Sequence, residues 1–66
     1  MTKLRIKELR EAKGLSQAQL AKEIGLNHRT ISQYERGITE PDLKTIEKLC
    51  LFFGETSDYL LGLTEY

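Results

Sequence analysis

The chain has 66 residues, one cysteine and a formal net charge of zero, so residues 1–66 form one domain at most. One cysteine excludes an intrachain disulfide and favours the reducing cytoplasm, and the longest apolar run, residues 49–53, is far shorter than the ~20 residues of a membrane span. Since valine, a strong strand former, is absent, we predict an all-α fold of short helices.

The first predicted helix runs from about residue 3 to residue 13. Ile6 and Leu9 recur at helical spacing and form its inward stripe. Arg10 follows at the edge of that stripe. The other basic residues of this segment are expected to form a solvated face.

Residues 16–37 are predicted to form two short helices, over 17–24 and 28–36. Ser16 and Gln19 have the spacing of a capping box, in which each side chain bonds a free backbone group of the other residue. Gly25 can end the first helix with a positive φ, and Asn27 is a strong N-cap for the second. Two capped helices joined by a short glycine turn are typical of the helix-turn-helix DNA-binding unit.

The helix predicted over residues 28–36 is amphipathic, with Ile31 and Tyr34 on its inward face. Its outer face has no acid at its centre. The side chains there can bond base edges and phosphates in a major groove: His28, Arg29, Ser32, Gln33 and Arg36.

Glu35 falls at the border between these two faces, as Arg10 does in the first helix. An arginine and a glutamate placed in this way can form a partly buried bidentate ion pair. The alternative is two separate exposed charges, and spacing alone leaves both open.

The charge is unevenly distributed along the chain. Residues 1–36 hold eight basic and four acidic groups, a net of +4, and residues 37–66 hold two basic and six acidic groups, a net of −4. Local charge governs encounter with DNA more than net charge does. The basic half therefore fits a nucleic-acid partner.

After the connector at Pro41, helices are predicted from about residue 42 to 53 and over 57–61. Four residues of the first of these follow the i, i+3, i+4, i+7 pattern of a core face: Ile46, Leu49, Cys50 and Phe53. Cys50 is thus read as a small buried hydrophobe rather than a reactive thiol. Leu51 and Phe52 point outward, which indicates a partner surface or a surface that the last helix covers.

No constellation for catalysis is evident. His28 is the only histidine, and neither a nucleophile–base pair nor a metal-ligand cluster can be assembled around it. We expect no enzyme activity, no metal and no cofactor.

The motifs GLSQ, LA, IG, TIS, YERG, a proline and DYLLG follow one another between residues 4 and 62. In this order they resemble the Cro/C1-type helix-turn-helix family of phage repressors and small bacterial regulators. The resemblance implies a compact five-helix, phage-repressor-like DNA-binding domain. Its first helix-turn-helix helix would lie across the DNA backbone and its second would enter the major groove, while residues 42–62 would supply core and a dimer surface.

The resemblance also implies residue roles. Base reading maps onto His28, Arg29 and Gln33, and the Arg10–Glu35 pair becomes a structural bridge. Contacts to the DNA backbone, or support for them, map onto Gln17, Asn27, Thr30, Ser32 and Arg36. Dimer contacts map onto Leu51, Phe52, Tyr59, Leu61 and Leu63.

Two residues depart from the family pattern. Glu55 stands where relatives often have a small apolar residue, and Leu51 stands where they are usually polar; both alter the expected dimer surface. Many relatives continue into a further C-terminal domain, so a chain ending at Tyr66 is expected to be a minimal regulator or a fragment.

The leading hypothesis is therefore a cytoplasmic homodimer that binds double-stranded DNA at a palindromic operator and regulates transcription as a repressor, with no membrane contact. The alternative is an antitoxin-like protein-interaction module that uses the helices over residues 42–62, with DNA binding secondary. The acidic second half and the outward apolar residues support this alternative.

Overall fold

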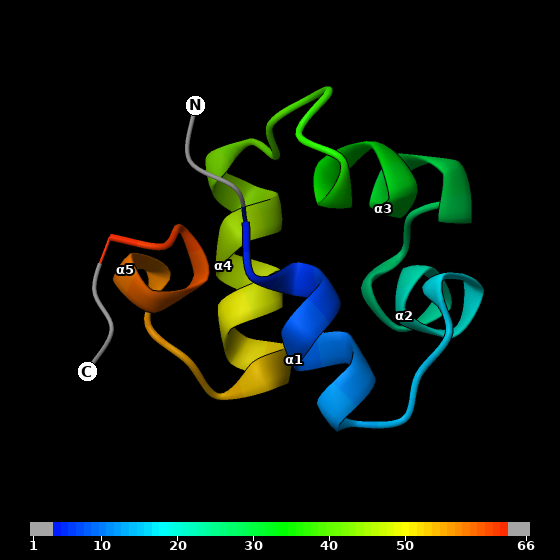
Figure 1. Cartoon of the computed structure of the whole chain (residues 1–66), viewed down its shortest axis with the longest axis horizontal. Helices are drawn as coiled ribbons and strands as arrows, with labels where there is room; N and C mark the ends of the chain where they lie inside the picture. The colour runs from blue at the N-terminus through cyan, green and yellow to red at the C-terminus, as the bar shows by residue number, and fades with distance from the viewer. Residues whose placement is uncertain (1–3, 64–66) are drawn as a thin grey trace.

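Five helices and no strand make up residues 4–63, the part of the chain that the computed structural model describes. The helices are α1 (Ile6–Ala12), α2 (Gln17–Ile24), α3 (His28–Glu35), α4 (Leu43–Phe53) and α5 (Ser57–Leu60). In Figure 1, α4 stands at the centre, with α5 on one side and α2 and α3 on the other. The prediction of an all-α, five-helix fold is confirmed.

The helix-turn-helix, α2 and α3, is defined by side chains close in sequence. Ser16 Oγ accepts from the backbone N–H of Gln19 at 3.1 Å, and Gln19 Oε1 accepts from the backbone N–H of Ser16 at 2.7 Å, which completes the capping box. Gly25 ends α2 with φ at +76°, a left-handed conformation that costs glycine little. Asn27 then caps α3. Both helices of the unit begin where the sequence predicts.

The first helix is predicted to start at residue 3, which lies outside the described residues. Within the described residues the prediction is wrong, because residues 4 and 5 are not helical and α1 begins at Ile6. The backbone N–H of Arg5 donates to the carbonyl of Leu60 in α5 at 3.0 Å. This contact ties the residue before α1 to the far end of the chain, a long-range partner that no local pattern reveals. The helices α3 and α5 end one residue earlier than predicted, with Arg36 and Leu61 as C-caps.

The core receives one fully buried large side chain from each helix: Ile6, Leu20, Ile31, Leu49 and Leu60. Around these lie the buried residues Leu4, Ala21, Ile24 and Tyr34. In α3 the buried residues lie on the inward face, so the core fixes this helix while its opposite face stays in solvent.

A testable consequence concerns the cap of α4. Asp42 Oδ1 accepts from the backbone N–H of Thr45 at 2.8 Å, and this bond holds the pKa of Asp42 below its ordinary value of 3.8. Because the folded pKa is the lower one, the cap stabilises the fold fully above pH 3.8, and this contribution is lost as the pH falls through the folded pKa. Asp42→Ala should destabilise the chain at neutral pH and ever less in acid. Urea unfolding over a pH series checks this, and a difference independent of pH would contradict it.

Candidate nucleic-acid interface

The outer face of α3 and the start of α2 form one open, polar hollow. The side chains of His28, Arg29 and Arg36 are exposed, and those of Ser32 and Gln33 are half-buried. The residues that line the hollow are Gln17, His28, Arg29, Ser32, Gln33, Arg36 and Ile38. All three residues predicted to read bases therefore share one surface with Gln17, Ser32 and Arg36, three of those predicted to contact the DNA backbone or to support such contacts.

The turn before α3 is closed by Asn27 and Thr30. Asn27 Oδ1 accepts from both the backbone N–H and the side-chain hydroxyl of Thr30, each at 2.9 Å. The acceptor oxygen of Asn27 is thus committed to the helix, which leaves its two amide N–H groups to donate outward. Such donors at a helix N-terminus suit a phosphate oxygen.

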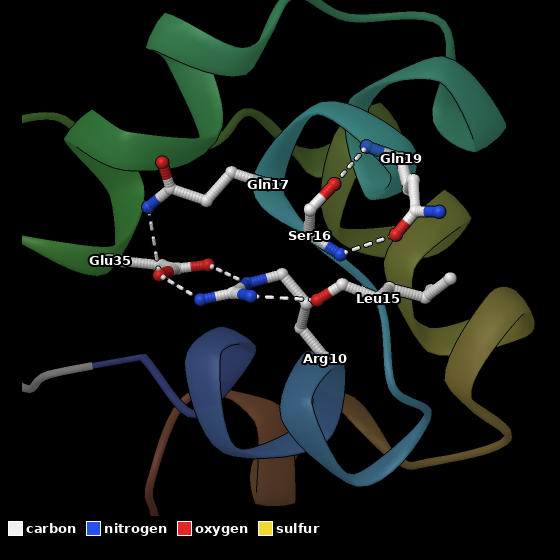
Figure 2. A network of polar contacts seen from close by, with 6 residues as sticks. All are labelled: Arg10, Leu15, Ser16, Gln17, Gln19 and Glu35. Atoms are coloured by element: carbon white, nitrogen blue, oxygen red, sulfur yellow. Dashed lines mark hydrogen bonds and ion pairs between the residues drawn. The ribbon is translucent and has the colours of Figure 1, made fainter.

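Behind this face, a buried ion pair joins α1 to α3, as Figure 2 shows. Arg10 Nε donates to Glu35 Oε2 at 2.8 Å, and Arg10 Nη2 donates to Glu35 Oε1 at 3.1 Å. The side chains are only 11% and 4% exposed, respectively. The hydrogen bond to Glu35 raises the pKa of Arg10 above its ordinary value, against the opposing effect of burial. The sequence left open whether Arg10 and Glu35 form an ion pair or two separate exposed charges, and the structure shows the ion pair.

Two contacts of this network have no counterpart in the sequence pattern. Arg10 Nη1 donates to the carbonyl of Leu15 at 2.7 Å, and Gln17 Nε2 donates to Glu35 Oε1 at 3.1 Å. The resemblance predicts that Gln17 contacts the DNA backbone. Its bond to Glu35 depends on how α2 and α3 cross, which spacing along the chain does not reveal. Ile38, on the rim of the hollow and 53% exposed, was also missed because it lies in an aperiodic connector.

The residues predicted as a dimer surface fall in two places. Leu51, which is 79% exposed, and Phe52 line an apolar groove with Ile24 of α2. Tyr59 lies in α5, where the Arg5 guanidinium stands 4.3 Å from its ring centroid, and Leu61 and Leu63 follow it. The first group borders α2 and the second belongs to α5 or follows it, two helices that Figure 1 shows on opposite sides of α4.

The remaining chemistry of the described part is sparse. Burial raises the pKa of the Cys50 thiol, which disfavours the reactive thiolate. Among residues 4–63, no three side chains of the metal-binding types gather into a possible site. Within the same residues, every helix is too short or too polar to span a membrane.

The chain matches a family of known proteins over most of its length. The family model described as helix-turn-helix matches residues 6–60. The SPbeta prophage-derived HTH-type transcriptional regulator YonR of Bacillus subtilis (strain 168) is 42% identical over 57 residues, which cover 86% of this chain and 53% of YonR. The chain spans about half the length of the first curated relatives that it matches.

Solved structures agree with the fold. The P22 c2 repressor, in complex with a synthetic operator, superposes with a TM-score of 0.82 at 37% identity over 86% of each chain. A chain of the SinR–SinI protein complex gives a TM-score of 0.80 at 31% identity, covering 92% of this chain and 60% of that one.

Proposed function

This chain belongs to the helix-turn-helix family, and from that premise we propose that it binds double-stranded DNA in a sequence-specific manner and represses transcription. The family and its relatives are transcriptional regulators rather than enzymes. The P22 c2 repressor was solved on a synthetic operator, and its fold matches this one closely. We place residues 1–66 in a single DNA-binding domain.

The observation that carries the proposal is the shared hollow of α2 and α3. Arg29, which lines it, can donate two bonds to guanine O6 and N7, and Gln33 can pair with adenine N6 and N7. His28 completes the base-reading set at the start of α3. Contacts to phosphates, or support for them, are assigned to Gln17, Asn27, Thr30, Ser32 and Arg36.

We further propose that the DNA-bound form is a two-fold homodimer. Such a dimer reads an inverted repeat whose half-sites lie one helical turn apart, ~10 bp, or a multiple of it. A two-fold interface uses the same patch on both subunits. Of the two groups of predicted dimer residues, Tyr59, Leu61 and Leu63 come from one short segment, α5 and the turn after it, and Figure 1 shows α5 on the other side of α4 from α2.

Selection of bound duplexes from a random-sequence pool tests the proposal. Enrichment of an inverted repeat, with two chains bound per repeat by sedimentation analysis, is the expected result. An enriched asymmetric site would remove the homodimer and keep the DNA-binding function, whereas no enrichment above the pool would remove sequence-specific binding.

Gln17→Ala tests the backbone role. We expect this substitution to weaken binding to every duplex by a similar factor, because phosphates are present in every sequence. Gln33→Ala is the matched control, the same change at a base-reading position, and should weaken the selected site far more than random DNA. Fluorescence anisotropy on both duplexes measures this, and a loss confined to the selected site in Gln17→Ala would contradict the assignment.

A second candidate function is the antitoxin-like interaction module that uses α4 and α5, with DNA binding secondary. The specific observation for it is the apolar groove at Leu51 and Phe52, whose charged lining residues are Lys22, Glu23 and Lys48. The full chain should then purify from its host with a protein partner in fixed stoichiometry. Purification of the chain alone, together with an enriched operator, would exclude this function as the primary one.

A further inference from the structure

The carboxylate of Glu35 accepts a hydrogen bond from Gln17 in addition to the two bonds from its ion-pair partner Arg10. The residue is 5% exposed, and Arg10 alone already satisfies both of its oxygens. Gln17 adds a third donor, its Nε2 lying 3.1 Å from Oε1. Figure 2 shows Glu35 of α3 between Arg10 of α1 and Gln17 of α2, so one buried group connects three helices.

The bond to Glu35 determines how the Gln17 amide is oriented. A carboxylate repels a carbonyl oxygen, so the amide must present its nitrogen to Glu35 and its oxygen away from it, as Figure 2 shows. The amide is planar, and its second N–H therefore has a fixed direction. Gln17 also lines the hollow of α3, so the N–H that Glu35 leaves free is carried by a side chain of the candidate DNA face.

The ion pair makes this arrangement compatible with DNA. A lone carboxylate behind a phosphate contact would repel the phosphate. Here the guanidinium of Arg10, 2.8 Å away, neutralises Glu35. The network can thus orient a donor near the DNA backbone without adding net negative charge.

We propose that Glu35 is a positioning residue for DNA binding: it holds one N–H of the Gln17 amide so that the other meets a backbone phosphate. Since Glu35 lies in the last turn of α3, the phosphate contact of α2 is then fixed relative to the base-reading side chains on that same helix. The inference depends on the proposed function, because it requires Gln17 to contact DNA.

Two double variants separate this role from the ion pair. Arg10→Met with Glu35→Gln removes both charges and keeps a carbonyl oxygen that can accept from Gln17. Arg10→Met with Glu35→Met removes both charges and also the acceptor, at nearly the same side-chain size. On a random-sequence duplex, the second variant should bind about 2- to 10-fold more weakly than the first, the range of one net hydrogen bond.

Adding Gln17→Ala to both double variants gives the decisive comparison. If Glu35 acts through Gln17, the difference between the two should vanish in this background. A difference that persists would mean that residue 35 acts only through the packing of the helices. Equal binding by the two original double variants, or tighter binding without the acceptor, would overturn the inference. Circular dichroism establishes the folded fraction of each variant before binding is compared.

A measurement on the unsubstituted chain does not depend on how the variants fold. In ¹⁵N-labelled protein, the side-chain amide of Gln17 should exchange its bonded proton more slowly than the amide of Gln33, and the addition of duplex should shift both Gln17 amide protons. A Gln17 amide that exchanges as fast as that of Gln33 would contradict the bond to Glu35. If the chain bound no DNA, the proposed function would fail while the slow exchange remained, so the two failures are distinguishable.

Discussion

Arg10→Ala is expected to remove a large part of the folding stability of the chain. Removing the guanidinium leaves the carboxylate of Glu35 buried, at 4% side-chain exposure, without its cation. Breaking a buried pair in this way costs ~3–5 kcal/mol. At ~0.05–0.15 kcal/mol per residue, a domain of 66 residues has ~3–10 kcal/mol of stability in total, so this loss is a large part of it. Thermal and urea unfolding, followed by circular dichroism, measure the loss.

A matched variant shows whether the uncompensated charge is the cause. Arg10→Met with Glu35→Met removes both charges, and replacement of a buried pair by apolar groups is often neutral or stabilising. This double variant should recover most of the stability that Arg10→Ala loses. A loss of less than about 1 kcal/mol in Arg10→Ala, the range of an exposed surface pair, would contradict the buried character of the bridge.

Leu49→Ala should also have a large effect, since Leu49 is the one residue of α4 that is fully buried. Truncating a buried leucine removes apolar contacts and leaves a cavity, at a cost of ~2–5 kcal/mol. Leu51→Ala is the control, because this leucine lies on the same helix two residues later and is 79% exposed. It should change the stability of the monomer by less than about 0.5 kcal/mol.

The same pair of variants bears on the partner surface. Urea unfolding at several protein concentrations gives both stabilities and reveals any dependence on association. If Leu51→Ala destabilised the chain as much as Leu49→Ala in dilute solution, the groove that it lines with Phe52 would be part of the core rather than an open surface.

Much of the helix-turn-helix could be predicted because its signals are local. The Ser16–Gln19 capping box, the positive φ of Gly25 and the Asn27 cap all act within four residues of the helix ends that they define. The start of α1 could not be predicted in this way, because the partner of the Arg5 backbone N–H is Leu60.

In the candidate interface too, the features that depend on local sequence could be predicted, and those that depend on helix packing could not. The outward direction of Arg29 and the inward direction of Ile31 follow from helical period alone. The bond from Gln17 to Glu35 joins residues 18 positions apart on two helices, and it depends on how those helices pack. Ile38 stands in a connector with no period, so only the folded chain brings it to the rim of the hollow.

The positions of the predicted dimer residues in the fold could not be predicted from the sequence. Periodicity turns Leu51 outward and the family resemblance assigns Tyr59 to the dimer surface, but Leu51 lines a groove with α2 and Tyr59 lies against Arg5. Helical periodicity indicates which residues of one helix point away from the core. It does not indicate which neighbouring helix they then meet.

Parallel selection from a random duplex pool with the unsubstituted chain and with Arg29→Ala tests the central claim most directly. If the outer face of α3 reads sequence, the variant should lose its preference at one base pair in each half-site, by ~1–3 kcal/mol, and keep the rest of the consensus. A variant that selects the unchanged consensus, with binding to specific and random duplexes weakened alike, would contradict the base-reading role of α3.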